Sequence, residues 1–165
     1  MSFSADLELC FGPARGYSGM DAWADIEAVV GELPTDYKEF VAAYGPGVIG
    51  DFLTVMHPQA QECTMLDLMA AMGPLYQSLV PHRIPYDVHP QERGMVLWAN
   101  TSEGDACFLI PHADGTWNIG VWFRQWAQWE EYDGSVPGWL VRQVTGELII
   151  PGLPLQRYGG FAPEG

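Results

Sequence analysis

The stretch 23–56 constrains the fold more than any other part of the chain, because it contains the pattern of two short amphipathic helices, a glycine turn and a strand. In its first half, Trp23, Ile26 and Val30 recur at helical spacing and Gly31 stops the helix. The next helix opens after a Leu-Pro pair, and Gly45 is suited to end it in a left-handed conformation. Its apolar stripe has the spacing i, i+3, i+4 and i+7, formed by Tyr37, Phe40, Val41 and Tyr44. Residues 52–56 then alternate as a half-buried strand.

The hydrophobic period changes to two after Gly94, which predicts strands. Residues 95–99, 105–110 and 117–123 alternate and are separated by turn signals at 101–104 and 114–115. Three strands joined by short turns form an antiparallel meander, and we expect the strand at 52–56 to join its edge. Segment 124–133 fits either a helical turn or a further edge strand.

Two more helices are predicted around this meander. Thr64 and Asp67 form a capping pair for a helix that ends or kinks at Gly73-Pro74, and Ser135 caps a last helix that Gly146 stops. Ser18 or Asp21 can cap the first helix of the chain. Residues 148–151 predict a final short strand. The fold class is therefore α+β, with helices packed on one mainly antiparallel sheet.

The chain of 165 residues is long enough for one domain with a substantial core. We expect residues 1–19 to be a poorly patterned N-terminal arm and residues 20–150 to be the folded domain. Residues 151–165 are rich in proline and glycine and predict a loose C-terminal tail, onto which Tyr158 and Phe161 can dock.

The order of residues in stretch 23–56 resembles the opening of the SUKH superfamily, the Smi–Knr-type domain. The resemblance is carried by Trp23, Ile26-Glu27, Gly31, Leu33-Pro34, Asp36-Tyr37-Lys38, Phe40, and Tyr44-Gly45 followed by Gly47 and a strand. It continues more weakly to about Gly146 and leaves out both ends of the chain. The resemblance implies an α+β fold and, for many bacterial members, an immunity protein that binds and neutralises a cognate toxin.

The charge balance restricts the partners of this chain. There are 21 acidic residues against 7 basic ones, a formal charge of -14, and Lys38 is the only lysine. This excess argues against binding nucleic acid or an anionic membrane, because both need basic contacts. It favours a basic protein partner, or serves solubility alone. No signal peptide or membrane-spanning run is apparent, and the three cysteines predict reduced thiols in a cytoplasmic protein.

Candidate catalytic and metal-binding groups are sparse. Cys107 and His112 lie five positions apart across a strand end, which is poor spacing for a thiolate–imidazolium pair. Asp87 and His89 supply two metal ligands at most, and the close acid pairs Glu103/Asp105 and Glu130/Glu131 fit exposed acids better than acid–base catalysts. We therefore expect no catalytic site, no cofactor and no metal.

The leading hypothesis from the sequence is a cytoplasmic, non-enzymatic immunity protein that blocks a basic toxin domain, which can be a nuclease. The alternatives are a scaffold or regulatory module that binds peptides or several protein partners, and a small enzyme that uses Cys107 or a His/Asp site. Tryptophans 117, 126 and 129 lie near acids and predict an amphipathic binding rim. The candidate contact residues, chosen for charge and expected exposure, are Asp51, Glu103, Asp105, Asp114, Trp117, Trp126, Glu130, Glu131 and Asp133.

Overall fold

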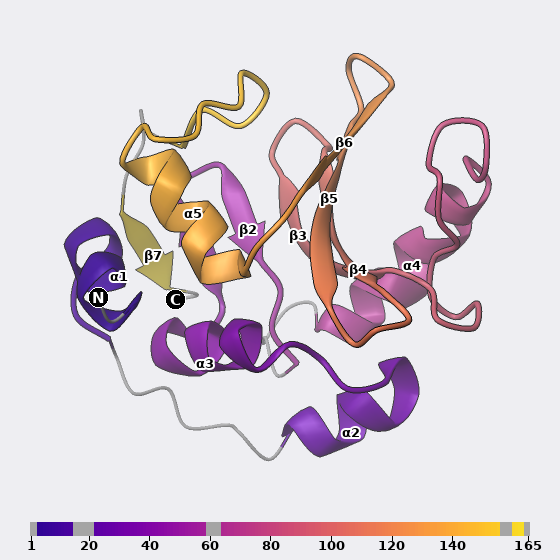
Figure 1. Ribbon diagram of the computed structural model, residues 1–165, viewed down its shortest axis with the longest axis horizontal. Coiled ribbons are helices and arrows are strands. Elements are labelled where there is room, and N and C mark those ends of the chain that lie inside the picture. The colour runs from indigo at the N-terminus through magenta and orange to yellow at the C-terminus, as the bar shows by residue number, and fades with distance from the viewer. Residues whose placement is uncertain (1–2, 15–21, 59–63, 156–159, 164–165) are drawn as a thin grey trace.

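The computed structural model of the chain describes residues 3–14, 22–58, 64–155 and 160–163, and in these ranges it has an α+β fold (Figure 1). Five helices accompany one antiparallel sheet of seven strands within these ranges. The helices are α1 (Phe3–Phe11), α2 (Ala22–Val30), α3 (Thr35–Tyr44), α4 (Met65–Gln77) and α5 (Val136–Val144). The strands are β1 (Gly47–Ile49), β2 (Leu53–Val55), β3 (Val96–Thr101), β4 (Ala106–Pro111), β5 (Trp117–Phe123), β6 (Gln128–Tyr132) and β7 (Phe161–Pro163).

The sheet has the strand order β6-β5-β4-β3-β2-β1-β7. Strands β3, β4 and β5 form the predicted meander, and β2 joins it through the pairing of Leu53 with Thr101, as expected. Segment 124–133, for which the sequence left two readings open, contributes the edge strand β6. Strand β1 was not predicted, because three residues between a glycine turn and a tight hairpin are too short to show alternation.

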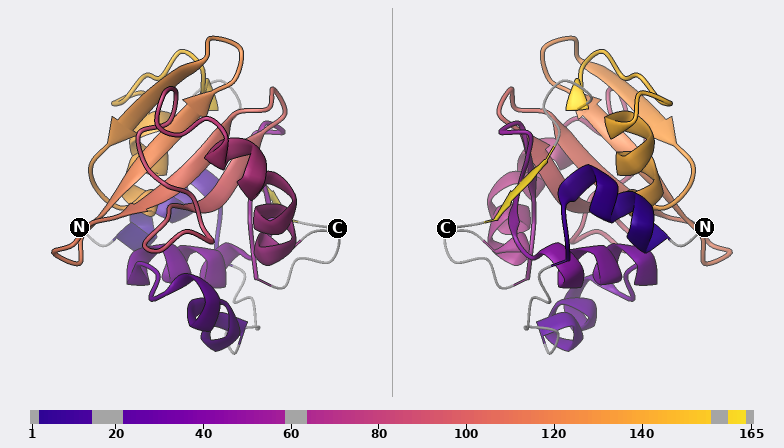
Figure 2. Two further views of the ribbon diagram at one scale, coloured as in Figure 1. Left: turned by 90° about the vertical axis from the view of Figure 1, so that its right-hand side faces the viewer. Right: turned by 90° about the vertical axis from the view of Figure 1, so that its left-hand side faces the viewer.

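Helices cover both faces of this sheet (Figure 2). Tyr76 of α4 packs edge-on against Phe108 of β4, with ring centroids 5.2 Å apart. On the other face, Trp98 of β3 packs against Tyr37 of α3 at 6.1 Å and against Trp139 of α5 at 5.9 Å. Trp98 is therefore a core residue, and the alternative of a partly open sheet face does not apply to it.

Several local predictions are confirmed at the helix ends. Helix α3 ends at Gly45, which has a φ of 73° and donates its backbone N–H to the carbonyl of Val41. Thr64 and Asp67 form the predicted capping box of α4, and that helix runs through Pro74 to Gln77. The hydroxyl of Ser135 accepts the backbone N–H of Gly138 at the start of α5.

The expectation that residues 1–19 are a poorly patterned arm is wrong for residues 3–11, which form α1. Leu7 and Phe11 are buried, and the Phe11 ring lies 6.1 Å from Phe40 and 6.0 Å from Tyr44 of α3. Tertiary packing against α3 supplies the stability that this short helix lacks by itself. The proposed caps Ser18 and Asp21 lie outside the described residues.

The expectation of a loose tail is also wrong for the described part of segment 151–165. Leu153 and Leu155 are buried, and β7 pairs with β1, so that Phe161 docks on the body as anticipated. The strand predicted at 148–151 is absent from the described sheet; Ile150 forms only a single bridge with Leu153. Tyr158 lies outside the described residues. Among the helices that the structure describes, none is long and apolar enough to cross a membrane.

Candidate binding surface

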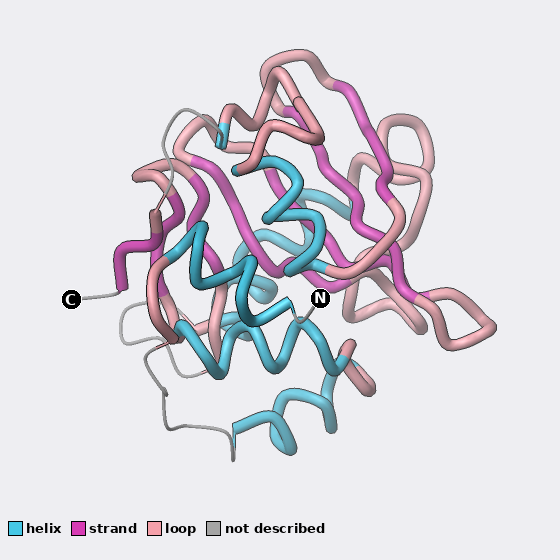
Figure 3. The backbone as a smooth tube through the Cα atoms, turned by 60° about the vertical axis from the view of Figure 1, so that its left-hand side comes forward, coloured by secondary structure: helices cyan, strands magenta, loops and turns pink. Residues whose placement is uncertain are grey.

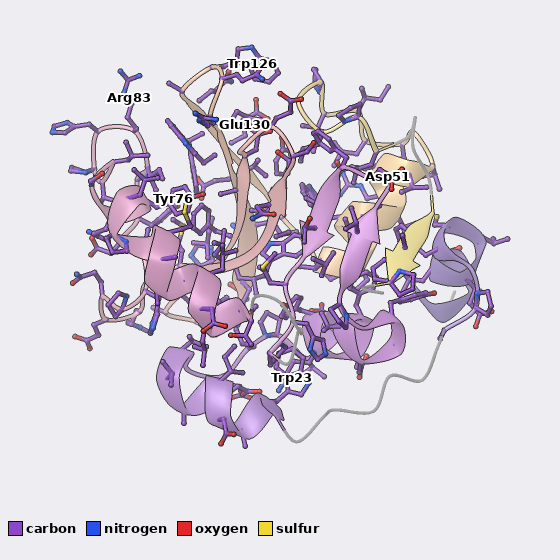
Figure 4. The ribbon with its side chains drawn as sticks, turned by 180° about the vertical axis from the view of Figure 1, so that it is seen from behind. Trp23, Asp51, Tyr76, Arg83, Trp126 and Glu130 are labelled. Atoms are coloured by element: carbon purple, nitrogen blue, oxygen red, sulfur yellow. The ribbon has the colours of Figure 1, made fainter. Side chains whose placement is uncertain are left out.

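Three turns of the sheet carry predicted contact residues and emerge at the same end. Asp51 lies in the β1–β2 turn, Glu103 and Asp105 in the β3–β4 turn, and Trp126 in the β5–β6 turn. The antiparallel register places these turns together, since Leu53 pairs with Thr101 and Ala106 pairs with Trp122. Figure 4 shows Trp126 and Asp51 on the same, upper side of the molecule.

A groove of about 220 Å³ lies at this end of the sheet, and we call it the turn-end groove. Side chains from the turns meet the segment 151–154 there, and no base is among the described lining residues. The lining consists of Phe52, Glu103, Asp105, Gln125, Trp126, Pro151, Gly152 and Pro154.

Trp126 is the most exposed aromatic side chain of the groove, at 57% exposure. Its ring lies 5.7 Å from the Phe123 ring, and Gly152 packs against both rings. A Cβ atom at position 152 would lie 2.5 Å from Phe123 and 2.7 Å from Trp126, so a glycine is required for this close approach. The segment around Gly152 thus packs against one side of the Trp126 ring, and much of the remaining surface of that ring is open to a partner.

Asp105 does not have the exposure that the sequence analysis expected, because it is only 4% exposed. One carboxylate oxygen accepts the hydroxyl of Thr101 at 2.9 Å, and the other accepts the backbone N–H of Arg124 at 2.9 Å. Asp105 therefore positions two turns of the groove.

Glu103 is exposed and accepts a hydrogen bond from the Gln125 side-chain amide at 2.5 Å, so it presents its charge at the surface.

Glu130 and Glu131 lie on the edge strand β6, where alternation directs them to opposite faces of the sheet. Glu130 is half-buried and accepts hydrogen bonds from the Tyr132 hydroxyl and from Gln128. Burial, followed by the hydrogen bond to Glu130, raises the pKa of Tyr132. Glu131 is exposed and hydrogen-bonds to Tyr86, whose pKa this contact raises.

The remaining predicted contacts lie at the opposite end of the sheet. Asp114 is in the β4–β5 turn, where it accepts the backbone N–H and hydroxyl of Thr116, and these hydrogen bonds lower its pKa. Trp117 is half-buried at the start of β5, and Asp133 follows β6. Glu130 and Glu131 lie on β6 between the two ends. The nine candidate residues therefore do not form one continuous surface.

The predicted tryptophan rim is also divided. Trp129 is half-buried and packs 5.9 Å from Phe108 and 6.4 Å from Tyr86, measured between ring centroids. The absence of a side chain at Gly120 makes room for it, since a Cβ atom there would lie 2.4 Å from the Trp129 ring. Trp126 is thus the member of the predicted rim with the largest accessible surface.

Two of the candidate chemical groups are buried or hydrogen-bonded within the described part of the chain. Cys107 is fully buried, and this burial raises the pKa of its thiol, which keeps the thiol protonated at neutral pH. Asp87 accepts a hydrogen bond from Gln77, and burial lowers the pKa of His89. No group of three or more histidine, cysteine or acidic residues suited to hold a metal ion occurs among the described residues. Cys63 lies outside them.

Sequence reasoning missed Phe52, Pro151, Gly152 and Pro154 as groove residues. The tail prediction separated the last three from the sheet, although the Pro-Gly-Leu-Pro-Leu run contains two leucines that needed burial. That pair of leucines was the available signal.

Comparisons of this chain with protein-family models, with curated proteins and with solved structures find no match.

Proposed function

We propose that this chain is an immunity protein that binds a cognate toxin domain with a basic surface and neutralises it in the cell that produces both. The turn-end groove would contribute the contact. The observation that carries this proposal is the excess of carboxylates without an ion-pair partner among the described residues, one of which, Glu103, lines the groove together with the exposed Trp126.

The charge excess is mostly uncompensated by ion pairs. The structure contains two ion pairs among the described residues, Lys38 with Glu27 at 2.7 Å and Arg142 with Glu147 at 4.0 Å. The chain has 21 acids against 7 bases, and most carboxylates of the described residues have no ion-pair partner there. An external basic surface is the complement that this distribution favours.

The turn-end groove combines two features of protein-binding sites. Trp126 offers a rigid aromatic surface that is supported from behind, which is typical of interface residues with large energetic effects. Glu103 is exposed in the same groove and supplies negative charge, and Asp51 adds an exposed carboxylate in the β1–β2 turn at the same end of the sheet. A nuclease toxin has a basic substrate groove, so an acidic protein that occupies this groove would exclude the nucleic acid.

The resemblance of residues 23–56 to the SUKH superfamily supports the same proposal. Trp23, Tyr37, Phe40 and Tyr44 are all buried in the structure, so these matching residues serve the fold. The proposed contact surface therefore uses other residues than these matching ones, on the turns and on segment 151–154.

Co-expression tests the proposed function. The toxin domain encoded beside this protein's gene should kill host cells when expressed alone and should spare them when this protein is present. A variant with Asp51→Lys and Glu103→Lys should protect less, at an equal protein level. Lack of protection by the wild-type protein, or the absence of a toxic product from the adjacent gene, would contradict the proposal.

A scaffold that binds extended peptides is the second candidate function. It is favoured by the lining of the turn-end groove with Phe52, Trp126 and two prolines, because aromatic grooves bind extended segments. A gene without a neighbouring toxin, together with peptide ligands selected by this groove, would favour the scaffold over the immunity protein.

A further inference from the structure

Helix α1, which the sequence did not predict, lies beside α3 on the side of the sheet that α5 also covers (Figure 3). Side chains of α1 and α3 line a cleft between the two helices. We call it the α1–α3 cleft. Its volume is about 230 Å³, and it shares no lining residue with the turn-end groove. The α1–α3 cleft is therefore separate from the turn-end groove, and acidic residues line it as well.

The lining of this cleft is mainly apolar. Leu7 of α1, Phe40 and Ala43 of α3, and Pro137 at the start of α5 line it. Ala43 is half-buried, whereas Leu7, Phe40 and Pro137 are buried by their packing in the core. The cleft is open at position 43 because the alanine side chain there is small. An apolar side chain of a partner that entered the cleft would be removed from water, which favours binding.

Three carboxylates surround this apolar lining. Glu8 belongs to α1, and Asp36 and Glu39 belong to α3; none has an ion-pair partner among the described residues. Lys38 lies two positions after Asp36 in the sequence, but its ammonium group pairs with Glu27 of α2. The cleft therefore has no basic group of its own among its described lining residues.

The negative charge affects groups inside the cleft. The pKa of Tyr44, which lines the cleft, is raised by burial and next by the charge of Glu8. The Tyr44 hydroxyl donates to the carbonyl of Gly12 at 3.0 Å and so helps to hold the end of α1 against α3. This hydrogen bond helps to fix the position of α1 relative to α3, and so the shape of the cleft.

We propose that the α1–α3 cleft binds a basic amphipathic segment of a partner protein. One apolar side chain of that segment enters the cleft, and lysine or arginine side chains next to it contact Glu8 and Glu39. An apolar hollow lined by three carboxylates that have no ion-pair partner among the described residues has this complement, because an acidic or neutral segment would bring no positive charge to them. The proposal does not depend on neutralisation of a toxin.

A synthetic amphipathic peptide of leucine and lysine is the probe, titrated by calorimetry into the full-length protein. The same peptide with glutamine in place of each lysine should bind much more weakly. The variant Glu8→Gln/Glu39→Gln should lose affinity for the lysine peptide by roughly 3- to 10-fold, as expected for two exposed charge contacts.

The matched control is Glu32→Gln/Glu92→Gln, which removes the same charge from two exposed sites outside the cleft. Its affinity should stay within about twofold of the wild type. Equal losses in both double variants would show attraction by net charge alone and would overturn the proposal.

The variant Ala43→Trp tests the apolar part of the cleft. It fills the space between α1 and α3 and should abolish binding of the lysine peptide while the circular dichroism spectrum is retained. Unchanged affinity would overturn the proposal. A concentration-dependent dimer that Ala43→Trp dissociates would also overturn it, because the occupant would then be a second copy of the chain.

Discussion

The carboxylate of Asp105 accepts the backbone N–H of Arg124 at 2.9 Å, and this bond connects the β3–β4 turn to the β5–β6 turn. Asp105 and Arg124 are 19 positions apart in the sequence. The bond holds the turn that carries Trp126 in place, so a buried acid determines the position of an exposed aromatic residue.

Replacing Asp105 by alanine should destabilise the protein. Asp105→Ala leaves the Thr101 hydroxyl and the Arg124 N–H without their acceptor, and we expect the free energy of unfolding to fall by about 2–4 kcal/mol. Urea denaturation measures this change. Glu103→Ala is the control, because Glu103 is exposed in the same turn, and its effect should stay within about 0.5 kcal/mol. Equal losses of stability in the two variants would contradict the conclusion that the buried hydrogen bonds of Asp105 stabilise the fold.

Trp126→Ala should weaken binding to the toxin without a comparable loss of stability. More than half of the side chain is exposed, so truncation removes contact surface more than core packing. A central aromatic contact is worth about 2 kcal/mol or more, which corresponds to roughly a 30-fold increase in Kd. Calorimetry of the purified pair measures it. Leu75→Ala on α4 is the control, since Leu75 is 54% exposed and lies outside the turn-end groove. A Kd that Trp126→Ala leaves unchanged would move the interface away from the groove.

Gly120 and Trp129 should be coupled in a double-mutant cycle. A Cβ atom at position 120 overlaps the Trp129 ring, so Gly120→Ala should cost about 1–3 kcal/mol of stability. In a protein that already contains Trp129→Ala, the same substitution should cost much less. Chemical denaturation of the four proteins gives the coupling. Additive effects would show that Trp129 does not lie over Gly120.

How much of the fold the sequence predicts depends on the length of each pattern. The stripe of α3 and the meander each repeat a signal over many residues, and the capping box of α4 is a specific short motif, so all three were predicted correctly. Strands β1 and β7 are only three residues long, and they and helix α1 are stabilised by partners distant in sequence, such as Phe11 with Phe40 and Phe161 with Ile49. No local pattern contains that information.

The candidate site was less predictable than the fold. The sequence identified Glu103 and Trp126, which the structure brings together, but it placed Asp114 and Asp133 in the same set, although they lie at the opposite end of the sheet. It also treated Asp105 as exposed, because an acid beside a turn usually is. Only the pairing of β4 with β5 shows that Asp105 faces the Arg124 backbone.

The stability of the protein should depend on Asp67 at acid pH. Hydrogen bonding with Thr64 lowers the pKa of Asp67 below its ordinary value of 3.8. Because the folded pKa is lower than the unfolded one, the stabilisation is complete above the ordinary pKa and is lost as the pH falls through the folded value. Asp67→Asn should therefore reduce the urea midpoint at neutral pH and flatten its decline on acidification. If the urea midpoint of Asp67→Asn fell with pH as steeply as that of the wild type, Asp67 would not contribute to the acid sensitivity of the fold.

Cys107→Ala should retain full protection of cells against the toxin. The thiol is buried and its pKa is raised, so it is unsuited to act as a nucleophile. Cell survival in co-expression measures the effect, with His89→Ala and His112→Ala tested in parallel. Loss of protection by a Cys107→Ala protein that is still folded, shown by circular dichroism, would favour an enzymatic function.

Titration of the purified toxin with this protein is the sharpest test of whether this protein binds a basic partner through its own acidic surface. For inhibition by binding, toxin activity should fall linearly to its minimum at a fixed stoichiometric ratio, and the association rate should decrease as salt is added. Inhibition by far less than a stoichiometric amount would mean that the protein modifies the toxin chemically. That result, or toxin activity that stays unchanged at excess protein, would contradict the account.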